Sequence, residues 1–203
     1  MDPLAIGEMI WEPELIPLLI AGPCVLEDGD EALRIASACV ELADKFDFLY
    51  VFKSSYLKDN RSSVDSYTGP GLEKGLSMLE RVRSETGVPV LTDVHCREEV
   101  GPAAEVCDIL QIPAFLSRQT RLILAAAGTG KAVNIKKGQF LSPENMHNAV
   151  EKARAGGAAG IMITERGTSF GYNNLVVDMT AFARMTTSWG VRSSHWGVAS
   201  RAG

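Results

Sequence analysis

The sequence predicts one α/β domain of the (β/α)8-barrel class. Short apolar segments alternate with amphipathic helical segments from about residue 17 to about residue 185, and this alternation indicates parallel strands covered by helices. The strand segments are continuously apolar, as expected for strands that are buried on both faces. No Gly-rich dinucleotide motif and no Walker loop opens a helix, so a barrel is favoured over a nucleotide-binding doubly wound sheet.

Six strand-helix units are expected along the chain. The strands cover residues 17–21, 48–53, 88–94, 107–112, 132–136 and 160–164, and the helices cover residues 29–46, 71–85, 97–105, 118–127, a segment capped by Ser142, and 174–185. The first helix is expected to pack through an apolar stripe with intervals of three and four, made of Ile35, Cys39, Leu42 and Phe46. Residues 1–16 are weakly patterned and are interpreted as a leader or a small cap.

The six predicted strand-helix units are two fewer than the eight of a complete barrel. The chain has 203 residues, whereas a barrel typically needs about 250. Residues 186–203 form an atypical tail, rich in glycine and serine, without a clear strand-helix pair. We therefore expect a single, incomplete catalytic barrel over residues 1–203. The change of character after Met185 suggests a truncated or frameshifted terminus.

Composition narrows the function classes. The net charge is −5 and the pI is about 5.3, so nothing global indicates binding to nucleic acid or to a membrane surface. No apolar run reaches the roughly 18 residues of a membrane span, and no signal peptide is recognisable. The four cysteines show no CxxC spacing. A reducing cytoplasm is the expected location.

Polar side chains follow the ends of the predicted strands, where barrel enzymes carry their chemistry. They include Cys24, Lys53, Asp93, His95, Gln111, Lys136 and Arg166. Alternate side chains of a strand share a face. This pairs Lys53 with Ser55, and Asn134 with Lys136, in the barrel mouth, and it turns Lys137 toward the helices or the rim.

A second group of cations lies in the polar loop that follows Lys53. It carries Lys58, Asn60, Arg61 and Ser62, a combination that suits the phosphate and hydroxyl groups of a sugar phosphate. With Lys136 and Arg166, several cations would converge in an acidic protein, which predicts anionic ligands. The alternative is that each cation is a solvated residue at a strand terminus.

Taken together, these motifs resemble the 3-deoxy-D-manno-octulosonate 8-phosphate synthase family over about residues 17–185. The matching segments are Ile20-Ala-Gly-Pro-Cys24, Phe52-Lys53 with Lys58-Asp-Asn-Arg-Ser-Ser63, Tyr67-Thr-Gly-Pro-Gly71, Thr92-Asp-Val-His95, Gln111-Ile-Pro-Ala-Phe115, Arg118-Gln-Thr120, Asn134-Ile-Lys-Lys137 and Glu165-Arg-Gly-Thr-Ser-Phe-Gly-Tyr-Asn-Asn-Leu-Val-Val-Asp178. The related heptulosonate 7-phosphate synthases carry a proline before the arginine of the sugar loop. Asn60-Arg-Ser-Ser63 therefore favours the five-carbon sugar phosphate.

The resemblance implies a transferase that condenses phosphoenolpyruvate with D-arabinose 5-phosphate for lipopolysaccharide synthesis, in a homotetramer. It implies phosphoenolpyruvate contacts from Lys53, Lys58, Gln111, Ala114, Lys136 and Arg166. It implies sugar contacts from Asn60, Arg61 and Ser62, with Arg118 reaching in from a neighbouring subunit. Asp93, His95, Lys136 and Asn60 are the implied catalytic residues.

Cys24 is the position that the resemblance links to a divalent metal. A cysteine here, instead of asparagine, resembles the metal-dependent members, in which the other ligands are a His, a Glu and an Asp from later strands. His195 is not assigned as a ligand, because its surroundings lack the apolar run and the aspartate of that motif. Two other functions remain open: a heptulosonate-type activity on erythrose 4-phosphate, and an inactive fragment that only binds phosphate.

Overall fold

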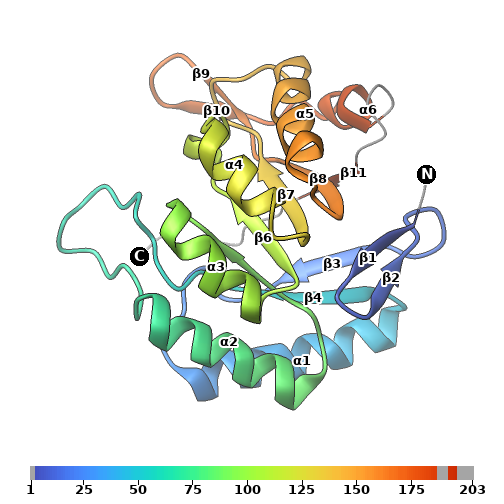
Figure 1. Cartoon of the computed structure of the whole chain (residues 1–203), viewed down its shortest axis with the longest axis vertical. Helices are drawn as coiled ribbons and strands as arrows, with labels where there is room; N and C mark the ends of the chain where they lie inside the picture. Colours follow the sequence, from blue (N-terminus) through green and yellow to red (C-terminus); the bar gives the residue numbers. More distant parts are fainter. Residues whose placement is uncertain (1–2, 187–191, 196–203) are drawn as a thin grey trace. The chain divides into compact units, whose positions relative to one another are not determined.

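The computed structural model describes residues 3–186 and 192–195 (Figure 1). The chain divides into two compact units, which are described separately. Unit 1 contains the residues up to Val94 and the segment Glu98–Leu110, and unit 2 contains His95–Arg97 and the residues from Gln111 onward.

Unit 1 is built around three parallel strands that neighbour one another in chain order. They are β3 (Leu18–Ala21), β4 (Leu49–Lys53) and β5 (Val90–Asp93). The unit also contains helices α1 (Gly29–Phe46) and α2 (Leu72–Thr86), most of α3 (Arg97–Val106) and the start of β6 (Ile109–Ile112). Helices α1 and α2 lie side by side (Figure 1). Chain-order pairing is the arrangement of a barrel, whereas a doubly wound sheet reverses its strand order at a switch point.

Helix α1 forms where it is predicted, but the predicted buried stripe is wrong. Asp28 caps the helix by accepting hydrogen bonds from the backbone N–H groups of Asp30 and Glu31, each at 2.9 Å. Leu42 and Phe46 are more than half exposed, and the fully buried positions are Ala32, Ala36 and Ala43. These alanines allow close backbone packing, which the spacing of large apolar residues does not reveal.

The segment interpreted as a leader or cap contains an antiparallel hairpin of β1 (Leu4–Ile6) and β2 (Met9–Trp11). Gly7 makes the turn with a φ of +59°, in the left-handed region that glycine adopts readily. Trp11 is buried, and its indole Nε1–H donates to the carbonyl of Ile16 at 2.9 Å. This hydrogen bond ties the end of the hairpin to the segment that precedes β3.

Unit 2 also has parallel strands in chain order. Strand β7 (Ala132–Lys136) pairs with β8 (Gly160–Glu165). Helices α4 (Thr120–Ala127) and α5 (His147–Gly156) pack against each other. Two short 3-10 helices, η1 (Ala114–Leu116) and η2 (Glu144–Met146), complete these connections. Ser142 does not cap α5 as predicted, because the N-cap of α5 is Met146. The Oγ of Ser142 instead accepts the N–H of Asn145 in η2 at 3.4 Å.

Two expectations about the end of the chain are corrected. Residues 174–185 are not one helix: they contain β10 (Asn174–Val176), which pairs with β9 (Thr168–Phe170), and then the short α6 (Ala181–Thr186). The tail also contains a strand, β11 (Arg192–His195), which runs parallel to β8. The free edge of β8 offers unpaired backbone groups, so an adjacent segment with little apolar character can still pair there.

The described structure thus confirms the predicted class, with parallel strands alternating with helices in the order of an incomplete barrel. Among residues 3–186 and 192–195, no helix is both long and apolar enough to cross a bilayer.

Candidate functional site

A buried cluster of two lysines and one aspartate lies at the carboxyl ends of β4 and β5 in unit 1. Lys53 ends β4, and its Nζ lies 3.7 Å from Oδ2 of Asp93, the last residue of β5. The same carboxylate oxygen lies 3.2 Å from Nζ of Lys58. Ser55 bridges the group, because its hydroxyl accepts a hydrogen bond from Lys53 Nζ at 3.1 Å and donates to Asp93 Oδ2.

Two of the three charged groups in this cluster are cations. The side chains of Lys53 and Asp93 are at most 5% exposed and that of Lys58 is 14% exposed, so water screens them poorly. Both ammonium groups contact the same carboxylate in this region of low dielectric. Cations fixed in this way are well suited to stabilising negative charge on a phosphate or carboxylate ligand.

The segment after β3 holds the strand end in place. Val25 forms a parallel bridge with Ser55, and the backbone N–H of Leu26 donates to the carbonyl of Ser55 at 2.9 Å. Gly22 lies so close that a Cβ there would be 2.2 Å from the carbonyl oxygen of Lys53. Only glycine permits this approach, which explains the Gly-Pro after the strand.

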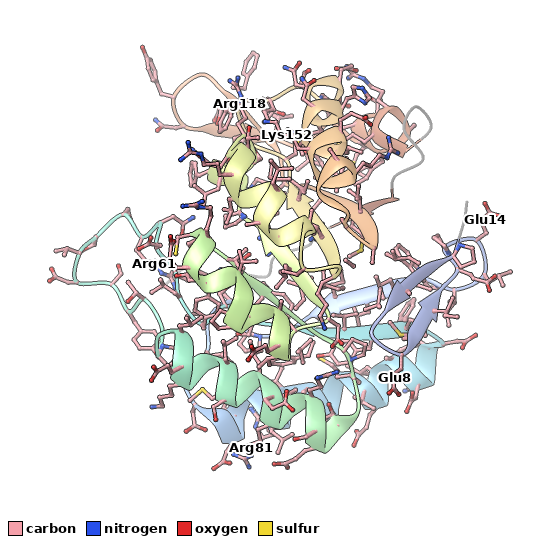
Figure 2. The ribbon with its side chains drawn as sticks, in the orientation of Figure 1. Glu8, Glu14, Arg61, Arg81, Arg118 and Lys152 are labelled. Atoms are coloured by element: carbon pink, nitrogen blue, oxygen red, sulfur yellow. The ribbon has the colours of Figure 1, made fainter. Side chains whose placement is uncertain are left out.

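The predicted sugar-binding residues occupy an exposed loop between β4 and α2. Asn60, Arg61 and Ser62 are all exposed, and Figure 2 marks Arg61 on this loop. Nε of Arg61 donates to the carbonyl of Tyr67 at 3.3 Å. The loop therefore presents a guanidinium, an amide and a hydroxyl to solvent, next to the buried Lys58.

Unit 2 carries a buried row of neutral polar side chains. Nδ2 of Asn134 on β7 donates to Oε1 of Gln111 at 2.8 Å, and Oγ1 of Thr164 on β8 donates to Oδ1 of Asn134 at 2.9 Å. All three side chains are fully buried. Lys136 is half-buried two residues beyond Asn134, so the two share a face of β7 as predicted. These hydrogen bonds fix the orientation of the side-chain amides of Gln111 and Asn134.

Lys137 is not a rim residue, because it is completely buried in unit 2. Its Nζ donates to the carbonyls of Gly138, Leu141 and Gly167 at 3.1–3.3 Å and lies 3.5 Å from Oε1 of Glu165. That carboxylate oxygen also accepts the backbone N–H groups of Arg166 and Gly167. Lys137 and Glu165 thus hold the loop that carries the half-buried Arg166. Sequence reasoning missed this pair, since adjacent lysines give no sign of which one is buried.

The other predicted site residues also lie in unit 2. Ala114 is buried in η1, His95 is half-buried, and Arg118 is exposed, with its carbonyl accepting a bond from Nζ of Lys152 at 3.3 Å. Figure 2 shows Arg118 and Lys152 on neighbouring segments around α4 and α5. The structure thus brings together Lys53, Lys58 and Asp93 in one unit and Gln111 and Asn134 in the other. Their convergence on one pair of ligands stays a prediction.

The described residues do not assemble the metal site that the cysteine after β3 implies. Cys24 is exposed. Within residues 3–185, whose side chains are described, no three side chains of His, Cys, Asp or Glu come close enough together to hold a metal ion. The donor set found here does not fit the group, so no step of the mechanism is routed through a metal.

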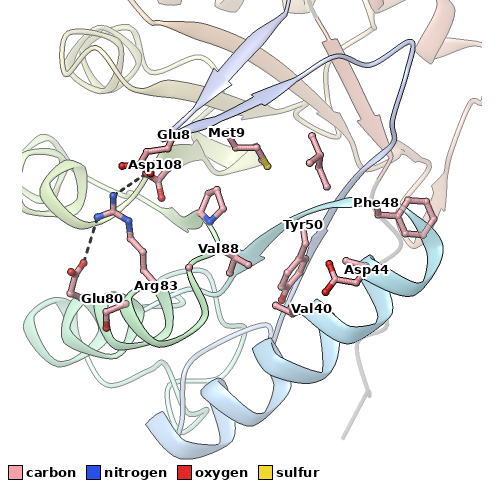
Figure 3. A pocket seen from close by; sticks show the side chains of 16 residues that line it. Glu8, Met9, Val40, Asp44, Phe48, Tyr50, Glu80, Arg83, Val88 and Asp108 are labelled. Atoms are coloured by element: carbon pink, nitrogen blue, oxygen red, sulfur yellow. Dashed lines mark ion pairs between the residues drawn. The ribbon is translucent and has the colours of Figure 1, made fainter.

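A hollow of about 610 Å³ lies elsewhere in unit 1 (Figure 3). It is lined by residues at the amino-terminal ends of the strands, including Leu49, Pro89 and Asp108, and by the β1–β2 turn. Arg83 lies between Glu80 and the buried Asp108 there (Figure 3). Barrel chemistry belongs to the opposite strand ends, so this hollow is not the candidate site.

Comparisons with known proteins agree with the geometry. The family model described as the DAHP synthetase I family matches residues 14–191. A protein of Nitratidesulfovibrio vulgaris (strain DP4), named 2-dehydro-3-deoxyphosphooctonate aldolase, is 56% identical over 167 residues, which are 82% of this chain and 61% of that protein. Proteins with the same name from Trichlorobacter lovleyi and Syntrophotalea carbinolica are 51% and 53% identical over 90% and 91% of this chain, and over 67% and 66% of their own lengths. The chain therefore spans about two thirds of these relatives or less.

Proposed function

Because the chain belongs to the DAHP synthetase I family, we propose that it condenses phosphoenolpyruvate with D-arabinose 5-phosphate to form 3-deoxy-D-manno-octulosonate 8-phosphate and phosphate. The observation that carries the proposal is the cluster in which Lys53 and Lys58 both contact the carboxylate of Asp93. The printed name of the relatives, 2-dehydro-3-deoxyphosphooctonate aldolase, supports the same product class.

Phosphoenolpyruvate is the ligand that the buried cations suit. Its phosphate and carboxylate would pair with the ammonium groups of Lys53 and Lys58. The family resemblance assigns Lys136 and Arg166 to the same ligand. Gln111 is held by Asn134 at 2.8 Å, so its amide is oriented before a ligand arrives. The backbone around the buried Ala114 would make a further contact with phosphoenolpyruvate.

The sugar phosphate is assigned to the exposed loop. Arg61 can bind a phosphate through two parallel hydrogen bonds, while Asn60 and Ser62 offer an amide and a hydroxyl to the carbon chain. Arg118 from a neighbouring subunit of a homotetramer would add a second cation. In this proposal the aldehyde end of the sugar would face Lys58 and Asp93.

The reaction forms one carbon–carbon bond and one carbon–oxygen bond to water, and it breaks the carbon–oxygen bond to the phosphate. The enol carbon of phosphoenolpyruvate attacks the aldehyde carbon, whose oxygen takes up a proton. Water then adds to the adjacent carbon of the former enol, loses a proton, and phosphate leaves by C–O cleavage. The family resemblance assigns catalytic roles to Asp93, His95, Lys136 and Asn60. Holding both substrates in one geometry removes much of the entropy cost of their encounter.

A heptulosonate-type reaction with erythrose 4-phosphate is the alternative. It is supported by the description of the matching family as the DAHP synthetase I family. The loop Asn60-Arg-Ser-Ser63 favours the five-carbon sugar. The deciding experiment measures phosphate release by the purified chain with each sugar phosphate. Faster release with arabinose 5-phosphate is expected, and a preference for erythrose 4-phosphate would reject the assignment.

A thermal melt with and without phosphoenolpyruvate separates an active site from an inactive fragment. A ligand that binds the folded chain at 100 times its Kd should raise the unfolding free energy by about 2.7 kcal/mol. A cooperative transition that phosphoenolpyruvate does not shift would contradict binding. The cytoplasmic location and the place in lipopolysaccharide synthesis follow from the proposed product and stay predictions.

A further inference from the structure

The exposed sugar loop is closed at its base by backbone and side-chain hydrogen bonds within unit 1. The N–H of Lys58 donates to the carbonyl of Thr68 at 2.6 Å. The hydroxyl of Tyr67 donates to the carbonyl of Leu26 at 2.9 Å. Between these points, residues 59–65 are exposed. The position of the whole loop therefore depends on how firmly its two ends are held.

Tyr56 lies at the centre of that base, two residues before Lys58. It is among the largest completely buried side chains of the described structure. Its carbonyl accepts the N–H of Gly71 at 3.2 Å. A Cβ on Gly69 would lie 2.3 Å from that carbonyl, and a Cβ on Gly75 of α2 would lie 2.2 Å from Cβ of Tyr56. The backbone on both sides thus fits closely around this one residue.

The phenol of Tyr56 reaches a charged partner on another helix. Its hydroxyl donates to Oε2 of Glu99 on α3 at 2.7 Å. Glu99 is half-buried, so this bond to a carboxylate is partly shielded from water. Hydrogen bonds to charged groups are the stronger class in proteins. Packing alone would be satisfied by phenylalanine, so the hydroxyl needs a separate explanation.

We propose that Tyr56 and Glu99 form a positioning latch, which sets the place of Lys58 and of the sugar loop for the condensation. The latch deepens the proposed function and rests on it for its kinetic consequences. Neither residue is assigned a contact with the substrates. Their effect passes through the backbone from Tyr56 to Lys58, whose Nζ lies 3.2 Å from Oδ2 of Asp93. Because Asp93 also tethers Lys58, the exposed residues beyond it should respond more strongly.

The test uses the whole chain and the variants Tyr56→Phe, Glu99→Ala and Glu99→Gln. Loss of one hydrogen bond to a charged group should raise the KM for arabinose 5-phosphate about tenfold, with a smaller change in the KM for phosphoenolpyruvate. Glu99→Gln keeps an acceptor oxygen but loses the charge, so its values should lie between those of the parent chain and those of Glu99→Ala. The double variant Tyr56→Phe/Glu99→Ala should be no worse than either single variant.

A second readout does not depend on activity. Trypsin can cut after Lys58 and Arg61, and Tyr56→Phe and Glu99→Ala should be cut there about tenfold faster than the parent chain when loop opening limits cleavage. Tyr50→Phe is the matched control, since it removes another buried hydroxyl, bonded to the carbonyl of Ala21, and should not accelerate cutting in the loop.

The outcomes separate the latch from the catalytic proposal. If the parent chain shows no turnover but the variants are cut faster, the latch holds and the reaction assignment fails. Equal cutting of Tyr56→Phe and the parent chain would overturn the latch, and so would a Glu99→Gln variant that behaves like Glu99→Ala. A rise in KM that is equal for both substrates would also contradict it.

Discussion

Replacing Lys137 with methionine should destabilise the protein strongly, although the neighbouring Lys136 should tolerate the same change. Lys137 is fully buried, and its Nζ contacts three carbonyl oxygens, the hydroxyl of Thr168 at 3.0 Å and the carboxylate of Glu165 at 3.5 Å. Methionine fills a similar volume but supplies no donor. The variant would leave Glu165 charged, buried and without its cation.

The size of the effect follows from that unpaired charge. Removing one partner of a buried ion pair costs about 3–5 kcal/mol. Oε1 of Glu165 would keep the backbone N–H groups of Arg166 and Gly167, which places the loss at the lower end of the range. For a chain of this length, a loss of about 3 kcal/mol lowers Tm by roughly 6–12 °C.

The assay is a thermal melt followed by circular dichroism, with Lys136→Met as the matched control. Lys136 is half-buried, so its variant should melt within a few degrees of the parent chain but lose the rise in Tm that phosphoenolpyruvate produces. The reasoning fails if Lys137→Met melts within about 2 °C of the parent chain. It also fails if Lys136→Met, and not Lys137→Met, is the variant with the large fall in Tm.

Three further changes test other parts of the structure. Asp93→Asn should abolish turnover. Because it removes the negative charge that both Lys53 and Lys58 contact, it should also lower the unfolding free energy by about 2–4 kcal/mol in a urea titration; unchanged turnover would exclude Asp93 from the site. Gly75→Ala should cost more than 1 kcal/mol, because its Cβ would lie 2.2 Å from Cβ of Tyr56, and an unchanged denaturation midpoint would show that the helix can shift. Burial raises the pKa of Tyr50 above that of a free phenol, so the unfolded chain loses this proton at a lower pH than the folded chain does. Folding stability should therefore fall as the pH rises above about 10. In alkaline melts, Tyr50→Phe should reduce this dependence of stability on pH.

The alternation of strands and helices could be predicted because each element carries its own periodicity. Strand β4 ends at Lys53 and β7 ends at Lys136, as the sequence indicated. The buried face of α1 was missed, since alanines pack closely without forming a conspicuous stripe. Strand β11 was missed because it pairs with the edge of β8 through backbone groups, which side-chain patterns do not report.

The candidate site was predictable where strand alternation places a side chain. That rule put Lys53 and Ser55 on one face, and the structure shows their hydrogen bond. It could not identify the roles of Lys137 and Glu165, because their partners are loop carbonyls and N–H groups whose positions depend on the folded backbone. It also gave no indication that Tyr56 bonds to Glu99, 43 residues later.

The hydrogen bond between Lys58 and Thr68 closes the base of the sugar loop, so residues 59–65 can be exchanged as one segment. Their side chains are exposed, so new sequences or lengths can be grafted there while the strand ends beneath keep their lysines. Libraries that seek other aldehyde acceptors should therefore vary this insert and leave the surrounding glycines untouched.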